Sequence, residues 1–377
     1  MRTLAVIINY KSSDLTLRAA RSVLGSESSG PVHLVVLDNS EDGYEAERLR
    51  QKLPPAVTLH VSQENIGFGR ACTQVFEQYE GERILLINPD ARLLPGCLLR
   101  LQDTLSSSPD VGAVSPRVFW DEGLRFHLPP SYPPALLPFK NFAFSGGPLA
   151  GVSGVVSALW RWHSIRVWRS KRPVRVNNLS GGLVLLKRAS VVAAGGLFDP
   201  RFFLYFEDTD LFIRMRKAGS TLLIEPRASA IHCYDQCAQR EWERKRAFMS
   251  RSLLLFQEKH NSGFKSRMNK IMDLLVSAAK GGTARRPLAP DFTAPFVLDV
   301  PERLKKRWIF EWSPNSNFIP SAARFGTGPT MEFPLECWAW LAPGQYFGRL
   351  GAQFPFGRYS HRLSWQVDRA ESREAQQ

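Results

Sequence analysis

Three acidic residues at the start of a predicted helix are the strongest chemical signal in this sequence. Glu207, Asp208 and Asp210 follow an aromatic stretch that includes Phe203 and Phe206, and they open an amphipathic helical pattern. A carboxylate packed against aromatic rings loses hydration, so its pKa rises toward a range suited to accepting a proton. Acids in a first helical turn also complement the helix dipole, and on this segment alone capping is the favoured interpretation. The rest of the chain favours a catalytic role for these acids over a capping role.

The first 120 residues alternate short β-branched runs with helical patterns, which predicts a parallel sheet covered on both faces. In open sheets of this kind, ligands bind beyond the carboxyl ends of the strands. The predicted strand ends carry Asn9-Tyr10, Asp38-Asn39-Ser40, Glu64-Asn65 and Asn88-Pro89-Asp90. Packing alone does not explain amides and acids at four strand ends, so we expect a binding site there. The sequence contains neither a P-loop nor a dinucleotide-binding glycine fingerprint.

Composition narrows the class of partner and the compartment. The net charge of +14 over 377 residues indicates an anionic partner, and no nucleic-acid reader motif accompanies the charge. The cysteines are odd in number, and Cys233 and Cys237 have poor zinc spacing, so a reducing, cytoplasmic location is expected. The N-terminal apolar run lacks a cleavage site and resembles a buried strand more than a signal peptide.

The composition changes between residues 128 and 172. Prolines crowd positions 129–138, and an uncharged, glycine-interrupted run covers 142–160, which makes a weak membrane-spanning candidate. Trp160, Trp162 and Trp168 then alternate with arginines and lysines, a pattern typical of the membrane interface. A surface loop over an acceptor cleft is the alternative. We expect this segment to be an insertion in a first domain spanning 1–280.

The C-terminal part of the chain has a different style. Basic amphipathic helices are expected over 240–260 and 265–279, followed by a linker over 281–290. Residues 291–377 are expected to form a small β-rich appendage, with strands over 296–300, 308–312, 336–341 and 361–367. Its aromatic residues are more simply explained by core packing than by sugar binding.

Six sequence blocks, in order, resemble family 2 glycosyltransferases of the GT-A fold, and most of all their bacterial rhamnosyltransferase-like branch. The blocks are VIINYKS at 6–12, LDNS at 37–40, ENIGFGRAC at 64–72, NPDA at 88–91, SGGLVLLKR at 180–188 and GGLFDPRFFLYFEDTDLFIR at 195–214. The likeness covers about residues 3–260. It implies a Rossmann-like mixed sheet flanked by helices. Thr73 replaces the asparagine usual after the third block, and Asn88 replaces the first acid of the usual Asp-x-Asp motif.

The resemblance also implies a reaction and its residues. Family members transfer a sugar, with inversion, from a nucleotide-diphosphate donor to a hydroxyl group. Asp208 matches the catalytic base, and Glu207 would orient the acceptor or raise the pKa of Asp208 by repulsion. Asp90 and His232 match a site for Mg²⁺ or Mn²⁺, which the leaving diphosphate requires. An imidazole favours Mn²⁺, although His232 could instead be a hydrogen-bonded core histidine.

Donor binding is assigned to residues at the predicted strand ends and in two glycine-containing blocks. Asp38 is expected to contact the base or ribose, and Arg70 the phosphates, while a glycine pair allows close approach of donor or acceptor. A tight turn into a strand would equally explain that pair. The full set is Asn9, Tyr10, Asp38, Asn65, Gly67, Arg70, Asn88, Gly181 and Gly182.

The expected acceptor is a lipid-linked oligosaccharide or growing surface polysaccharide, and rhamnose is one candidate sugar. The basic surface favours peripheral contact with the anionic inner face of the cytoplasmic membrane, without nucleic acid. A catalytically inactive nucleotide-sugar or glycan-binding protein, with the β-rich region as its recognition module, is the alternative function. A nucleotidyltransferase is disfavoured because no basic, glycine-rich N-terminal signature is present.

Overall fold

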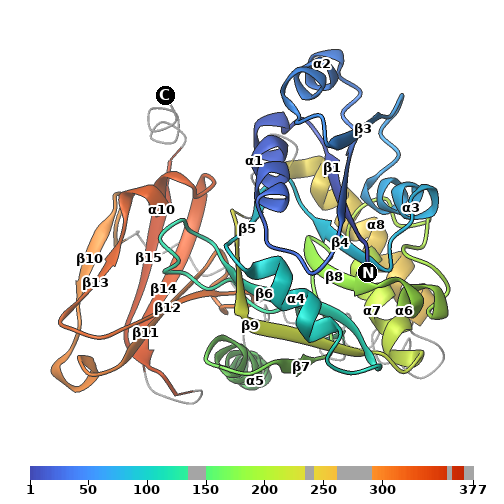
Figure 1. The fold of residues 1–377 in the computed structure, drawn as a ribbon. Coiled ribbons are helices and arrows are strands. Elements are labelled where there is room, and N and C mark those ends of the chain that lie inside the picture. The colour runs from blue at the N-terminus through green and yellow to red at the C-terminus, as the bar shows by residue number, and fades with distance from the viewer. Residues whose placement is uncertain (135–149, 234–241, 261–290, 355–358, 369–377) are drawn as a thin grey trace. The chain divides into compact units, whose positions relative to one another are not determined.

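The chain folds into two compact units, seen in a computed structural model that describes residues 1–134, 150–233, 242–260, 291–354 and 359–368 (Figure 1). Unit 1 comprises residues 1–118 and 170–264, and unit 2 comprises 119–169 and 265–377. This division differs from the predicted domains. Residues 119–169 group with the C-terminal region, whereas the sequence analysis treats 128–172 as an insertion in the first domain. The predicted helix at 265–279 and the linker at 281–290 lie outside the described residues.

Unit 1 is built on a mixed sheet in which the strand order is β3-β2-β1-β4-β8-β6-β9-β5, with β7 paired to β9. Strands β1 to β4 pair in parallel, as the alternating pattern predicts, and β8, β5 and β7 add antiparallel pairings. The strands are β1 Thr3–Asn9, β2 Val32–Asp38, β3 Val57–Val61, β4 Arg83–Ile87, β5 Ala91–Leu93, β6 Val111–Phe119, β7 Val174–Val176, β8 Leu183–Lys187 and β9 Thr221–His232.

Helices bury an apolar stripe against this sheet. In α1, Leu17, Ala20 and Val23 recur at helical spacing and are buried, while the polar positions between them face solvent. The helices of unit 1 are α1 Ser13–Leu24, α2 Gly43–Lys52, α3 Phe68–Gln78, α4 Cys97–Leu105, α6 Arg188–Ala193, α7 Glu207–Lys217 and α8 Trp242–His260. Helices α1 and α4 contribute to one hydrophobic core with the strands. The predicted fold class, a mixed α/β sheet flanked by helices with a β-rich C-terminal region, is confirmed.

Unit 2 contains a four-stranded sheet, β12-β11-β14-β15, and a two-stranded sheet, β10-β13. Its core is aromatic, with Trp308, Phe310, Phe333 and Trp365 all buried. The aromatic residues of this region therefore serve mainly as core, as expected. Its elements are α5 Ala150–Trp168, β10 Phe296–Asp299, η5 Glu302–Leu304, β11 Trp308–Ser313, β12 Ala322–Gly326, β13 Thr330–Phe333, α10 Leu335–Ala339, β14 Gly344–Ala352 and β15 Tyr359–Val367.

The predicted strand over 336–341 is wrong, because this segment contains helix α10. Alternating Trp338 and Trp340 imitate a strand. The buried residues, however, are Cys337, Trp338 and Leu341, whose spacing fits one face of a helical turn.

Two of the three tryptophans of helix α5 are buried in the protein. Trp160 and Trp168 are buried, so the prediction that all three tryptophans face a membrane interface is wrong for these two. Arg161, between them, is also buried and pairs with Glu311 at 2.7 Å. Trp162 is 48% exposed. Among the described residues, no helix combines the length and hydrophobicity that crossing a bilayer requires.

Candidate functional site

A carboxylate and an imidazole meet at the end of two paired strands of unit 1. Antiparallel pairing aligns Ala91 of β5 with His232, the last residue of β9, and Asp90 immediately precedes β5. The Asp90 Oδ1 and His232 Nε2 atoms are 3.0 Å apart, and both residues are largely buried. The two residues that the sequence analysis assigns to a metal are therefore neighbours, although they lie far apart in the chain.

The Asp90–His232 pair fits a cation that takes few ligands from the protein. The Asp90 oxygen and the His232 nitrogen lie within hydrogen-bond distance of each other, and a donor set of one oxygen and one nitrogen suits Mn²⁺ and accommodates Mg²⁺. Within the described ranges, no group of three or more His, Cys, Asp or Glu residues could hold a metal. The remaining ligands would be water and phosphate oxygens, as is usual where such ions bind nucleotide diphosphates.

Two consecutive glycines separate this pair from the acidic motif of α7. A Cβ on Gly181 would lie 3.0 Å from the Cβ of Asp208. A Cβ on Gly182 would lie 2.7 Å from the Asn88 Nδ2 and 3.4 Å from the His232 Cε1. The Gly182 carbonyl also accepts the Asn88 N–H at 2.7 Å. The metal-side residues and Asp208 therefore lie on either side of one peptide unit.

Asp208 is held by the backbone of the glycine pair and by its own helix. Its Oδ2 accepts the Gly181 N–H at 3.0 Å, and its Oδ1 accepts the Thr209 N–H at 2.6 Å. Burial raises the pKa of Asp208, and these hydrogen bonds oppose the rise without cancelling it. The preceding residues Tyr205 and Phe206 have φ angles of +71° and +67°, a left-handed conformation that costs roughly 1–3 kcal/mol per residue. Strain concentrates beside the acids.

Glu207 is a buried acid that forms no ion pair in the described part of the chain. It is 5% exposed, and among the described residues its Oε2 atom has no hydrogen-bond partner. Burial, and secondarily the negative charge of Asp208, raises the pKa of Glu207 to about 8. Glu207 is therefore protonated at neutral pH, and the adjacent acids differ in their environments.

The third acid of the motif belongs to the scaffold. Asp210 accepts from Arg214 at 2.8 Å and also contacts Lys259 and His260 of α8. Burial raises the pKa of Asp210, but the bonds from His260, Lys259 and Arg214 outweigh this and hold it at about 2. Asp210 thus anchors the end of α8 to α7.

The donor-side residues of β1 and β2 form a buried network. Register pairs Asn9 with Asp38, and the Asn9 Nδ2 donates to the Asp38 Oδ1 at 2.8 Å. Glu45 of α2 also accepts from Asn9, at 3.1 Å, and its Oε2 accepts the Ser13 N–H at the start of α1. Sequence reasoning misses Glu45, because its partners are 32 or more residues away and its own helix shows no motif.

The third sequence block mainly supports the acidic motif. A Cβ on Gly67, which has a φ of +84°, would lie 2.6 Å from the Phe203 carbonyl oxygen, and that oxygen accepts the Phe68 N–H. Asn65 Oδ1 accepts the Gly67 N–H at 3.0 Å. Arg70 donates its Nε to the Pro200 carbonyl at 2.8 Å, and its predicted role in binding phosphate stays a prediction.

Two further predicted positions also have partners within unit 1. Thr73, the residue that departs from the family pattern, accepts the Phe198 N–H at 3.3 Å. The Tyr10 hydroxyl lies 3.5 Å from the Arg244 Nη1 of α8. The structure thus brings together Asn9 with Asp38, and Asn88, Asp90 and His232 with the glycine pair and Asp208.

A comparison with known protein families identifies the family to which this fold and site belong. A model described as glycosyltransferase like family 2 matches residues 2–251, more than half of the chain. The chain therefore belongs to glycosyltransferase family 2, and the predicted GT-A class is confirmed by that membership.

The chain is also similar to individual proteins of known activity or structure. The chain is 26% identical over 253 residues to the N-acetylglucosaminyl-diphospho-decaprenol L-rhamnosyltransferase of two Mycobacterium tuberculosis strains, which covers 62% of this chain and 77% of each relative. Among solved structures, a Pyrobaculum calidifontis mannosyltransferase with GDP-mannose and Mn²⁺ matches with a TM-score of 0.43 and 15% identity, covering 75% of this chain and 76% of that one. GalNAc-T7 with UDP, GalNAc and Mn²⁺ matches with a TM-score of 0.47 and 13% identity, covering 98% and 72%.

Proposed function

We propose that this protein is an inverting, metal-dependent glycosyltransferase that moves a sugar, such as rhamnose, from a nucleotide-diphosphate donor to a hydroxyl of a lipid-linked glycan. The carrying observation is that one glycine pair adjoins both the Asp90–His232 pair and Asp208. A donor phosphate bound on one side and an acceptor hydroxyl bound on the other would then flank one sugar. The rhamnosyltransferase relative acts, by its name, on a decaprenol-linked diphosphate substrate, which supports this acceptor class.

Asp208 is the residue to which we assign the general base. The acceptor O–H proton passes to its carboxylate, the oxygen forms a bond to the anomeric carbon, and the bond from that carbon to the diphosphate breaks. Attack from the face opposite the leaving group inverts the configuration. The raised pKa of Asp208 supports this role, because a base with a higher pKa accepts the proton more readily.

Asp90 and His232 are assigned to hold the divalent cation, and Asn88 to line the same edge. A bound divalent cation stabilises the negative charge that develops on the leaving diphosphate. Glu207, neutral at pH 7, can donate a hydrogen bond to the acceptor, which an ionised carboxylate could not. The buried Asn9–Asp38 pair is assigned to the nucleoside end of the donor.

Peripheral contact with an anionic membrane completes the proposal. On α5, Val155, Leu159 and Trp162 are 60%, 44% and 48% exposed and lie at helical spacing on one stripe. Arg166 continues the stripe, and its guanidinium lies 6.0 Å from the centre of the Trp162 ring. Apolar side chains beside a cationic one suit the headgroup region of a bilayer.

The function is tested by incubating the purified full chain with a panel of nucleotide sugars and measuring nucleoside-diphosphate release, with and without Mn²⁺. Release from one donor, abolished by EDTA and by Asp90→Ala, is the expected result. Donor binding without release, in the presence of lipid-linked acceptors, would support a binding protein instead. Release unaffected by EDTA would overturn the metal assignment.

Membrane contact is tested by flotation with phosphatidylglycerol vesicles. We expect binding at low salt that falls steeply as salt rises, and a several-fold loss on Trp162→Ser. Val297→Ser, at another exposed apolar side chain of unit 2, is the matched control and should float like the wild type. Absence of binding at low salt would contradict this part of the proposal.

A further inference from the structure

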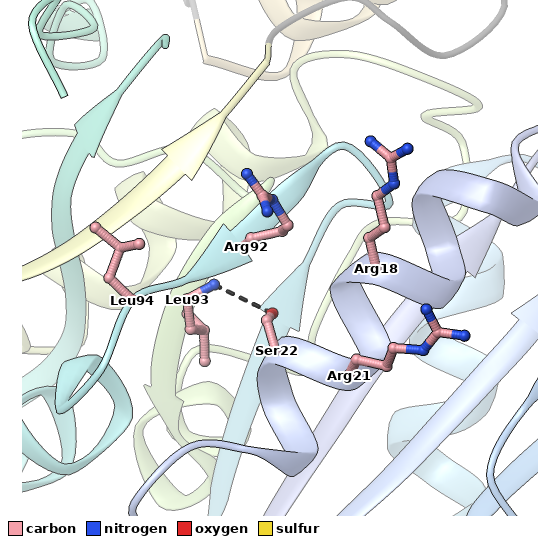
Figure 2. Close-up of a pocket in the computed structure, with 6 residues that line it drawn as sticks. All are labelled: Arg18, Arg21, Ser22, Arg92, Leu93 and Leu94. Atoms are coloured by element: carbon pink, nitrogen blue, oxygen red, sulfur yellow. Dashed lines mark hydrogen bonds between the residues drawn. The ribbon is translucent and has the colours of Figure 1, made fainter. Parts of the chain in front are cut away.

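A basic hollow in unit 1 lies outside the residues assigned to donor and base. Its volume is about 350 Å³, and its walls come from α1 and from the segment that begins with β5 (Figure 2). The residues that line it are Arg18, Arg21, Ser22, Arg92, Leu93 and Leu94. None of the residues assigned above to donor, metal or base contributes to its lining.

The walls are tied together by the backbone. Ser22 Oγ accepts the Leu93 N–H at 3.2 Å (Figure 2). The same hydroxyl donates to the Ala19 carbonyl at 2.7 Å. The opposite face of α1 is buried in the core. The hollow is therefore formed by two elements fixed to each other, and its arginines extend from a rigid frame.

Among the described residues, the charged side chains that line this hollow are all arginines, with no acid among them. Within the described residues, the Arg18 and Arg21 side chains form no ion pair or hydrogen bond, and Asp14, one turn before Arg18, is paired with Arg48. Like charges on adjacent helical turns cost a few tenths of a kcal/mol. Concave walls concentrate the positive potential of such charges.

We infer that this hollow binds a diphosphate group. Arginine presents paired N–H donors that match phosphate oxygens, and the two guanidinium groups of Arg18 and Arg21 suit a ligand of two or more negative charges. A volume at the lower end of the usual range for ligand sites fits a diphosphate better than a whole nucleotide sugar. The inference does not rest on the proposed function, because it needs neither donor nor transfer. The same group could come from a soluble diphosphate or from a polyprenyl diphosphate headgroup.

The test is calorimetric titration of the full chain with inorganic pyrophosphate in EDTA, so that no divalent cation supports binding elsewhere. We expect Arg18→Gln combined with Arg21→Gln to weaken binding at least 30-fold. Arg50→Gln combined with Lys52→Gln on α2 removes the same charge outside the hollow and should change affinity less than 3-fold. Thermal unfolding of both variants checks that each is folded.

A second arm identifies the source of the diphosphate. Phosphatidylcholine vesicles containing a polyprenyl diphosphate are tested for capture of the protein, with pyrophosphate as competitor. Capture that pyrophosphate and the Arg18/Arg21 double substitution both abolish supports a lipid headgroup; pyrophosphate binding without capture supports a soluble diphosphate. No pyrophosphate binding by the wild type, or an equal loss in the α2 control, overturns the inference.

Discussion

The pKa values of two buried glutamates, Glu207 of unit 1 and Glu311 of unit 2, are shifted in opposite directions. Glu207 of unit 1 has an oxygen without a partner among the described residues, and its pKa is raised to about 8. Glu311 of unit 2 is fully buried but accepts from Arg161 at 2.7 Å and from Arg349 at 2.8 Å. Burial raises the pKa of Glu311, and the two arginines outweigh it, so the net shift is downward. Burial alone therefore does not mark a functional acid.

The two residues show how a buried acid that stabilises the fold differs from one that is available for chemistry. Glu311 is ionised and compensated, and its two arginines also bond backbone carbonyls or stack on aromatic rings, such as Arg349 on Phe318. Glu207 is neutral, sits beside strained backbone and adjoins a second acid. An acid left uncompensated in a buried site is a candidate for function, because the fold tolerates its cost without gaining an ion pair.

The largest expected effect is on catalysis at the acid beside Glu207. Asp208→Asn removes the proposed base while keeping the side-chain shape, so we expect the rate of transfer to fall about 10³-fold, equivalent to about 4 kcal/mol of barrier. Steady-state nucleotide release measures this, and nucleotide affinity should stay within 3-fold. The control Glu302→Gln changes an exposed acid of unit 2 and should leave the rate unchanged. Wild-type turnover by Asp208→Asn would remove this residue from the role.

The next effect concerns stability in unit 2. Glu311→Gln leaves two buried guanidinium groups uncompensated, and we expect the free energy of unfolding of unit 2 to fall by about 3 kcal/mol. Urea denaturation followed by tryptophan fluorescence reports this unit, because every tryptophan except Trp242 belongs to it. Glu302→Gln again serves as control, with an expected change below about 0.5 kcal/mol. If Glu311→Gln lowers the free energy of unfolding no more than the control does, the proposed difference between the two glutamates is wrong.

A third expected effect is a change in the pH dependence of stability. Between its ordinary pKa of 4.5 and its folded pKa of about 8, Glu207 holds a proton in the folded state that the unfolded chain releases. Its contribution to stability is complete below pH 4.5 and is lost as the pH rises toward 8. The free energy of unfolding should therefore decrease less with pH in Glu207→Gln than in the wild type. The difference between the two slopes should correspond to at most one proton. Urea unfolding of both proteins at pH 5, 6.5 and 8, followed by circular dichroism, measures it; parallel pH profiles would show that Glu207 is ionised in the fold.

Local patterns predict much of unit 1. The apolar runs ending at Asn9 and Asp38 give strands of nearly equal length, and parallel pairing then places both side chains at one edge. The blocks around Asp90, Gly181 and Asp208 likewise identify residues that the fold brings together. These successes share a cause, since strand ends are fixed by where hydrophobic runs stop.

Pairings across long sequence separations could not be predicted. The Arg161–Glu311 pair spans 150 residues. The local alternation of tryptophan and arginine therefore predicts a membrane-facing charge where the structure has a buried ion pair. The strand predicted over 336–341 failed because tryptophans alternate in a segment too short to show its helical period. Roles in the donor site for Asn65, Gly67, Tyr10 and the glycine pair stay predictions.

The glycine pair has a consequence for how substrate range could change. The offset between its two sides is set by one peptide unit, whose Cα atoms stand about 3.8 Å apart in any trans peptide. Covalent geometry, unlike a side-chain rotamer, does not vary with temperature or with the identity of nearby residues. A sequence could thus diversify around Gly181 and Gly182, altering which sugar and which alcohol the proposed site admits, while the spacing of the two glycines between the proposed base and the proposed metal pair stays constant.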